Sequence, residues 1–211
     1  EWQERYKKPV VFDECCYEGN INMAWGNISA FEMVNRFWRG CIQGSFVTHG
    51  ETYVSEDEVL WWARGGRLKG QSVPRIAFLK NILYSLPSHL SLWKEPAVMG
   101  PDDRNITATV FERPEEAYER FHALINKEER ELSQAKDACY YGQCGEQAYI
   151  KYFARQCAAL CSLTLPEDKK YEVEIIDVWE MTRTTVLEEA CGWVEVRLPG
   201  KEGIAVMAKQ L

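Results

Sequence analysis

The hydrophobic residues in the first part of the chain follow one pattern twice. A short apolar run at residues 9–13 precedes a loop, and apolar residues at helical spacing follow from residue 31 to residue 41. A second short run at residues 45–48 comes before another helical segment at residues 72–85. Short continuous apolar runs are typical of parallel strands buried on both faces, and strand, loop and helix in this order form one βα unit. The pattern therefore predicts two successive βα units.

Local signals predict where the helices begin. Ser29 and Glu32 have the Ser-x-x-Glu spacing of a capping box, which favours a helix start. The same spacing at Ser55 and Glu58 predicts a short helix that carries Trp61. Pro74 suits the first turn of the segment at 72–85, because its missing N–H would have no helical partner there.

The pattern changes in the second half of the chain. Prolines at residues 87–101 mark a domain boundary, and charged residues at 115–135 enclose apolar positions at helical spacing, which predicts an exposed helix. After residue 136, six or seven short alternating segments separated by turn residues indicate an antiparallel β-sandwich. The predicted fold is α/β followed by all-β, with βα units at 1–95, a linker and helix at 96–136, and a sandwich at 137–211.

Charge and hydropathy exclude two classes of partner. The net charge is −7 and the Lys and Arg residues are scattered, whereas a phosphate backbone needs a basic face. The sequence has neither an apolar run long enough to cross a bilayer nor an N-terminal signal pattern. We therefore expect neither nucleic acid nor a membrane as a partner.

The eight cysteines do not have the spacing of a metal site. No C-x-x-C motif occurs, and the three histidines are remote from the cysteines in sequence. Reduced, buried thiols are the simpler interpretation, including Cys15 and Cys16, which have no histidine nearby to activate them. We expect no metal and no cofactor.

Polar residues gather where the two predicted strands end. Asp13 and Glu14 follow the first strand, and His49 follows the second. In parallel α/β folds the active site forms at the carboxyl ends of the strands, and a carboxylate among Tyr, Trp and His side chains is typical of glycoside hydrolysis. Glu14 is the candidate catalytic residue, and the candidate substrate-binding residues are Tyr17, Glu18, Trp25, His49, Glu51, Tyr53 and Trp61. Two other interpretations remain open: Glu14 caps its loop or pairs with an arginine, and Trp25 serves packing alone.

The segments "DECCYEG" (13–19) and "THGETY" (48–53) resemble motifs of a known family. They are similar to the C-terminal part of bacterial clan A glycoside hydrolases, and in particular to apiosidase-like (β/α)8-barrel proteins with a trailing β-sandwich. The resemblance extends from about residue 7 to residue 211 and is weakest between 96 and 136. It implies that the two βα units are the last two of a barrel from a bacterial protein. Since the thiols are expected to be reduced and no signal pattern is present, we expect a cytoplasmic location.

The resemblance also implies a mechanism. In this clan a glutamate at the end of the seventh barrel strand is the nucleophile of a reaction that retains anomeric configuration, and it corresponds to Glu14. The acid/base residue belongs to the fourth strand, which this chain lacks, so we expect the chain to be part of a longer enzyme, as its start at Glu1 also suggests. Within the chain, Glu18 and Glu51 are the available substitutes. The expected partners are a glycoside or oligosaccharide and the remainder of the barrel, or a second copy of the chain when it is expressed alone.

Two alternatives to an enzyme segment remain. In the first alternative the chain is a non-catalytic carbohydrate-binding or interaction module, in which aromatic side chains bind glycan and Glu14 only accepts hydrogen bonds from hydroxyls. A degenerate remnant of an enzyme is the third possibility, and it predicts poor solubility.

Overall fold

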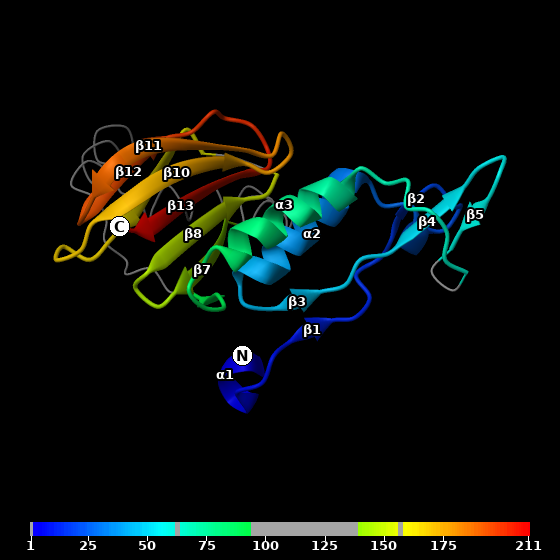
Figure 1. Ribbon diagram of the computed structural model, residues 1–211, viewed down its shortest axis with the longest axis horizontal. Helices are drawn as coiled ribbons and strands as arrows, with labels where there is room; N and C mark the ends of the chain where they lie inside the picture. The colour runs from blue at the N-terminus through cyan, green and yellow to red at the C-terminus, as the bar shows by residue number, and fades with distance from the viewer. Residues whose placement is uncertain (1, 62–63, 94–138, 156–157) are drawn as a thin grey trace, which may run out of the picture.

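The computed structural model describes residues 2–61, 64–93, 139–155 and 158–211 (Figure 1). Its helices are α1 (Trp2–Tyr6), the short 3-10 helix η1 (Ala24–Gly26), α2 (Ala30–Ile42) and α3 (Ser72–Tyr84). The strands before residue 94 are β1 (Val11–Phe12), β2 (Glu18–Gly19), β3 (Phe46–Val47), β4 (Glu51–Val54), β5 (Val59–Leu60) and β6 (Ser91–Leu92). Those after residue 138 are β7 (Cys139–Cys144), β8 (Ala148–Phe153), β9 (Leu160–Thr164), β10 (Tyr171–Asp177), β11 (Thr182–Ala190), β12 (Trp193–Arg197) and β13 (Ile204–Gln210). The predicted linker and the helix at 115–135 lie outside the described residues.

Helix α2 begins where its capping signal predicts. Ser29 Oγ accepts a hydrogen bond from the backbone N–H of Glu32 at 3.1 Å, which satisfies one of the N–H groups that have no helical partner. The Glu32 carboxylate accepts from Arg36 Nε at 2.8 Å, so the reciprocal half of the capping box is replaced by an ion pair. Helix α3 also matches its predicted range, beginning at Ser72 and ending at Tyr84.

Strands β1 and β3 form a two-stranded parallel sheet. Val11 pairs with Phe46 and Phe12 with Val47, which confirms the predicted strands and their parallel direction. The prediction that the first strand is buried on both faces is wrong, because Val11 is 56% exposed and Phe12 is 48% exposed. Each strand has a single neighbouring strand, and the described residues close no barrel.

The predicted helix at Ser55 is replaced by a β-hairpin. Strands β4 and β5 pair antiparallel, and the Ser55 N–H donates to the Glu58 carbonyl at 3.0 Å across the turn. Ser55 Oγ donates to the Asp57 carboxylate at 2.7 Å, so the serine stabilises the turn rather than a helix start. Trp61 follows β5 in an isolated bridge with Gly65.

The second half of the chain forms an antiparallel β structure, as predicted. Six strands form one sheet in the order β11-β10-β13-β8-β7-β6, and β9 pairs with β12 in a second sheet. The C-terminal strand β13 lies in the middle of the larger sheet, between β8 and β10. Strand β6 lies within the proline-containing stretch predicted as the domain boundary and nevertheless pairs with β7.

The larger sheet is covered on both faces. In β13, Ala205 and Met207 belong to a core formed with α2 and α3, whereas Ile204 and Val206 belong to a core that includes Leu163 of β9. This division follows from the alternation of side chains along a strand. Figure 1 shows α2 and α3 beside β7 and β8. The two helices of the βα units therefore share a hydrophobic core with the β structure.

No helix among the described residues has the length and apolar character needed to cross a membrane.

Candidate functional site

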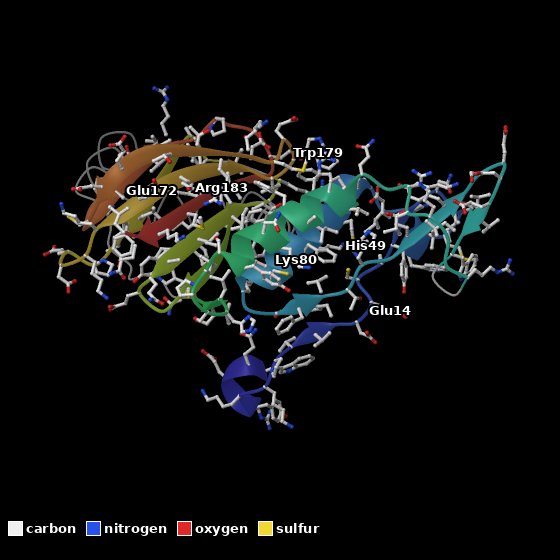
Figure 2. The ribbon with its side chains drawn as sticks, in the orientation of Figure 1. Glu14, His49, Lys80, Glu172, Trp179 and Arg183 are labelled. Carbon is white, nitrogen blue, oxygen red and sulfur yellow. The ribbon has the colours of Figure 1, made fainter. Side chains whose placement is uncertain are left out.

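Glu14 lies two residues after the end of β1, at the carboxyl end of the parallel pair, and is exposed (Figure 2). Burial raises the pKa of the Tyr17 phenol, and the negative charge of the nearby Glu14 carboxylate raises it further. Between them, Cys16 has a positive φ of 68°, an uncommon conformation for a residue with a side chain. This turn in the chain lets Tyr17 reach back to Glu14.

The loop that follows Glu14 forms hydrogen bonds with a residue of α2 and with the residue that follows β3. Arg36 Nη1 donates to the Cys15 carbonyl at 2.6 Å, and Cys15 Sγ donates to the Thr48 carbonyl at 3.5 Å. A Cβ on Gly50 would lie 2.1 Å from the Tyr17 ring, so this ring packs directly on the Gly50 backbone. Arg36 was not among the sequence candidates, because only the folded helix brings it to the loop.

Three of the candidate aromatic residues form a continuous chain of contacts. The Tyr17 and Trp25 rings meet edge to face with their centroids 5.8 Å apart, and Trp25 and Trp61 meet in the same way at 5.8 Å. All three side chains are partly buried, so the rings combine packing with some exposed surface. The structure thus brings together residues separated by more than forty positions in sequence.

Glu18 and Glu51 lie side by side in the parallel pair β2–β4, and both are buried. Glu18 Oε1 accepts from the Tyr53 hydroxyl at 2.9 Å and from the Gln71 N–H at 2.8 Å. Its Oε2 accepts from the Ser72 N–H at 3.1 Å, at the start of α3. Carboxylates are favourable at helix N-termini because the backbone N–H groups there carry partial positive charge.

Glu51 holds the preceding part of the same loop. Its Oε2 accepts from the N–H groups of Lys69 at 2.7 Å and Gly70 at 3.0 Å. Glu51 and Glu18 are 3% and 1% exposed, so a solvent-borne substrate does not reach them in this structure. Both carboxylates anchor the loop before α3, and the expectation that they contact substrate or replace the missing acid stays a prediction.

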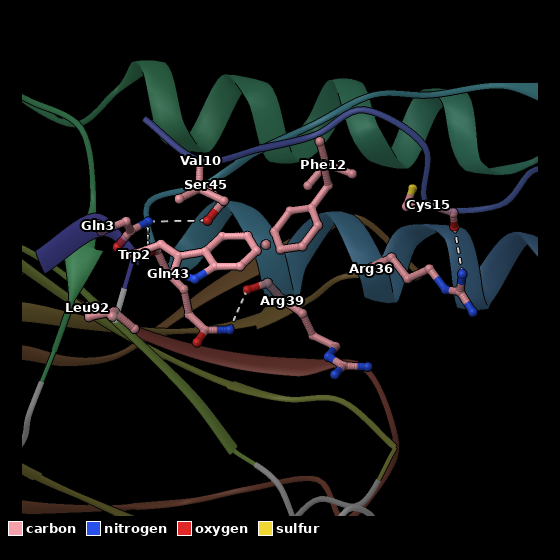
Figure 3. Close-up of a pocket in the computed structure, with 12 residues that line it drawn as sticks. Trp2, Gln3, Val10, Phe12, Cys15, Arg36, Arg39, Gln43, Ser45 and Leu92 are labelled. Carbon is pink, nitrogen blue, oxygen red and sulfur yellow. Dashed lines mark hydrogen bonds between the residues drawn. The ribbon is translucent and has the colours of Figure 1, made fainter. Parts of the chain in front are cut away.

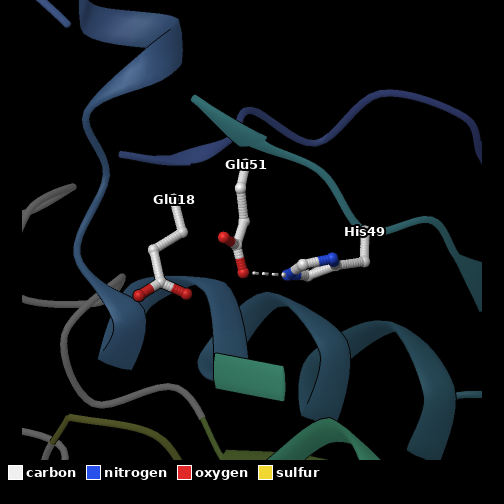
Figure 4. A group of neighbouring side chains, drawn as sticks. All are labelled: Glu18, His49 and Glu51. Atoms are coloured by element: carbon white, nitrogen blue, oxygen red, sulfur yellow. Dashed lines mark ion pairs between the residues drawn. The ribbon is translucent and has the colours of Figure 1, made fainter. Parts of the chain in front are cut away.

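His49 joins this buried group from the segment between β3 and β4. Its Nε2 lies 3.1 Å from Ser72 Oγ and 3.7 Å from Glu51 Oε1 (Figure 4). Burial lowers the pKa of His49, although the nearby Glu51 and Glu18 carboxylates oppose the shift. Burial also raises the pKa of Tyr53, and its hydrogen bond to the Glu18 carboxylate acts in the same direction. The candidates therefore form two groups, one around Glu14 and one around Glu51.

A groove runs along the β1 side of the parallel pair. It has a volume of about 630 Å³ and is bordered by Trp2 and Gln3 of α1, Phe12 of β1, and Arg39 and Gln43 of α2 (Figure 3). A second groove, of about 740 Å³, lies between α2, α3 and β3. Two largely apolar hollows thus border the parallel pair.

Comparison with known proteins identifies two structural relatives. The chain superposes on a candidate glycoside hydrolase from Bacteroides vulgatus with a TM-score of 0.69 and 26% identity, covering 99% of this chain and 37% of the other. It also superposes on a protein named as a glycoside hydrolase, with a TM-score of 0.56 and 12% identity over 96% of this chain and 42% of the other. The chain spans less than half the length of either protein, and its fold is similar to part of a glycoside hydrolase.

The sequence comparisons cover less of the chain. Residues 137–209 match the model of a domain of unknown function, DUF5605. No curated protein matches the chain.

Proposed function

We propose that this chain is part of a clan A, apiosidase-like glycoside hydrolase and that Glu14 is its catalytic nucleophile. The observation that carries the proposal is the position of Glu14, which is exposed at the carboxyl end of a parallel strand and has the Tyr17 phenol nearby. A retaining glycosidase needs an ionised carboxylate that can reach the anomeric carbon. Glu14 has that exposure, whereas Glu18 and Glu51 are buried.

The parallel pair β1–β3 supplies the second line of support. In a closed (β/α)8 barrel each strand has a neighbour on both sides, whereas within the described part of the chain β1 and β3 pair only with each other. Val11, Phe12 and Phe46 are about half exposed along this ribbon, beside the two grooves. We assign these surfaces to the remaining strands and helices of the barrel, which would also supply the acid/base residue.

In this mechanism Glu14 attacks the anomeric carbon while the acid/base residue protonates the departing oxygen. Water then hydrolyses the glycosyl-enzyme ester, and the acid/base residue, now acting as a base, takes the proton of that water. Tyr17 lies near the carboxylate, and Trp25 and Trp61 offer aromatic surface to a sugar ring. The substrate class is a glycoside or an oligosaccharide.

The test is a Glu14→Gln substitution in a polypeptide that contains this sequence together with the rest of the barrel. Hydrolysis of activated aryl glycosides should fall roughly 10³-fold or more, while sugar binding persists. Asp13→Asn is the matched control, since it removes the adjacent exposed carboxylate and should leave turnover unchanged. A Glu14→Gly variant supplied with azide should form a glycosyl azide of inverted configuration, which only loss of a nucleophile predicts. Full activity of Glu14→Gln would refute the assignment.

A carbohydrate-binding module is the second candidate, and the chain of aromatic contacts through Trp25 favours it. It predicts that the 211-residue chain binds oligosaccharide alone and that Glu14→Gln in the longer polypeptide leaves turnover unaffected. Isothermal titration calorimetry with the isolated chain measures the binding, and the turnover assay decides between the two functions.

A further inference from the structure

The buried group of Glu18, His49 and Glu51 keeps acceptor positions that its hydrogen bonds do not use. Glu51 Oε2 already accepts two backbone N–H groups, but Oε1 is fully buried and has no hydrogen-bond partner within the described part of the chain. Glu18 Oε1 accepts two hydrogen bonds, whereas Oε2 accepts one, from Ser72. A buried polar atom without a partner is costly and requires an explanation.

The charge of the group is also unbalanced. Two carboxylates are buried together, and among the described ion pairs their only basic partner is His49, which carries a charge only when protonated and whose Nε2 lies 3.7 Å from Glu51 Oε1. Lys69 gives its backbone N–H to Glu51, but its ammonium group pairs with Asp57 and Glu58 at the surface. Buried carboxylates are normally paired or bound to a metal, because removing their charge from water is expensive.

The free acceptor atoms converge on one small region. One ligand atom from each of Glu18, His49 and Glu51 lies within 4.8 Å of the other two, and Figure 4 shows the three side chains facing a common space. Gly70 borders it: an added Cβ would lie 2.4 Å from Glu18 Oε2 and 2.6 Å from Glu51 Oε1. The absence of a side chain at Gly70 therefore leaves the approach to both carboxylate oxygens open.

We propose that Glu18, His49 and Glu51 bind a single divalent transition-metal ion, with Zn²⁺ the best match. Two carboxylates and one imidazole are suitable Zn²⁺ ligands, whereas Mg²⁺ and Ca²⁺ prefer oxygen alone. Coordination at 2.0–2.2 Å would draw the three ligand atoms to separations of about 3–3.5 Å. Ser72 Oγ, 3.1 Å from His49 Nε2, is placed to complete the coordination or to bind a coordinated water.

Such an ion would crosslink β2 and β4 and stabilise their contacts with the start of α3. Glu18 and Glu51 are adjacent partners in β2 and β4, and both already hold the loop that leads into α3. The metal would neutralise the paired carboxylates and satisfy Glu51 Oε1. This site does not depend on the catalytic role of Glu14, so either proposal can fail alone.

The test is calorimetric titration of the 211-residue protein with Zn²⁺ after treatment with EDTA. One equivalent should bind to the unaltered chain. Glu51→Gln preserves the shape of the side chain and can still accept the N–H groups of Lys69 and Gly70 through its amide oxygen, but it places an NH₂ group at the open position. We expect this variant to bind Zn²⁺ more than about 100-fold less tightly, since even loss of a partner that only orients a ligand costs 10–100-fold.

Two controls make the result specific. Asp57→Asn removes a neighbouring carboxylate that is exposed at the surface, and it should bind Zn²⁺ like the unaltered protein. His49→Gln provides a second ligand variant in case Glu51→Gln does not fold, with circular dichroism as the check on folding. Failure of the unaltered chain to bind Zn²⁺ would overturn the proposal. Equal affinity in folded ligand variants would also overturn it, because the cysteines would then hold the ion.

Discussion

The hydrogen bond between Tyr152 and Asn35 joins the helical layer to the β structure. Tyr152 is in β8 and Asn35 is in α2. The Tyr152 hydroxyl donates a hydrogen bond to Asn35 Oδ1 at 3.1 Å, and both side chains are buried. Asn35 in turn donates through Nδ2 to Glu32 at 3.3 Å. Tyr152→Phe keeps the ring but leaves the Asn35 carbonyl oxygen without this donor in the core.

The cost follows from the difference between losing a hydrogen bond and leaving a partner unsatisfied. The bond itself contributes about 1 kcal/mol, and a buried acceptor left without a donor costs about 1–3 kcal/mol. Because the ring still fills its space, the cavity contribution is small. We expect Tyr152→Phe to lower the free energy of unfolding by about 2 kcal/mol, and Asn35→Leu in the same chain to recover part of that loss by removing the unsatisfied group.

Urea denaturation followed by tryptophan fluorescence measures this change. With a slope of about 2–3 kcal/mol per molar urea, the transition midpoint should fall by roughly 0.7–1 M. Tyr140→Phe is the matched control: Tyr140 pairs with Tyr152 across β7 and β8 and contacts its ring, but has no hydroxyl hydrogen bond within the described residues. Equal midpoints for both variants, or no shift in Tyr152→Phe, would refute the proposed coupling between α2 and the sheet.

Two further predictions concern the same layer. Burial opposes ionisation of Glu32, but hydrogen bonds from Arg36, Arg155 and Asn35 outweigh it and lower its pKa below 4.5. The ionised carboxylate therefore contributes stability above about pH 4.5, and this contribution is lost as the pH falls through the lowered pKa. Glu32→Gln should reduce the melting temperature at pH 7 and have a smaller effect under acid conditions; a constant difference across pH would contradict this. Gly142→Ala would place a Cβ 1.8 Å from the Ile42 carbonyl oxygen, so the free energy of unfolding should fall by about 1–3 kcal/mol. Urea denaturation measures this change, and the neighbouring substitution Gln143→Ala should have little effect on it.

Local patterns predicted the elements whose stability depends on nearby residues. Ser29 caps α2 as its spacing indicates, and the alternating segments after residue 138 form strands. The Ser-x-x-Glu spacing at Ser55 failed because a hairpin turn satisfies the same hydroxyl. The β-branched residues that flank this turn, among them Val54 and Val59, were the signal for strands.

The candidate site was predictable in its residue types but not in its organisation. Glu14 and Tyr17 are close in sequence, so their contact follows from one turn in the chain. The environment of Glu51 depends instead on backbone N–H groups of Lys69 and Gly70, which every non-proline residue possesses and which no motif reveals. The burial of Glu18 likewise depends on how the loop folds back onto β2.

The central position of β13 has a consequence for synthesis on the ribosome. In the described structure residues 204–210 cover one edge of β8 and one edge of β10, so both edges stay unpaired until this segment has left the exit tunnel. Pairing between residues so distant in sequence is slow, and uncovered strand edges invite association with other chains. During translation, the larger sheet should therefore depend on chaperones or on early packing against α2 and α3 until its middle strand arrives.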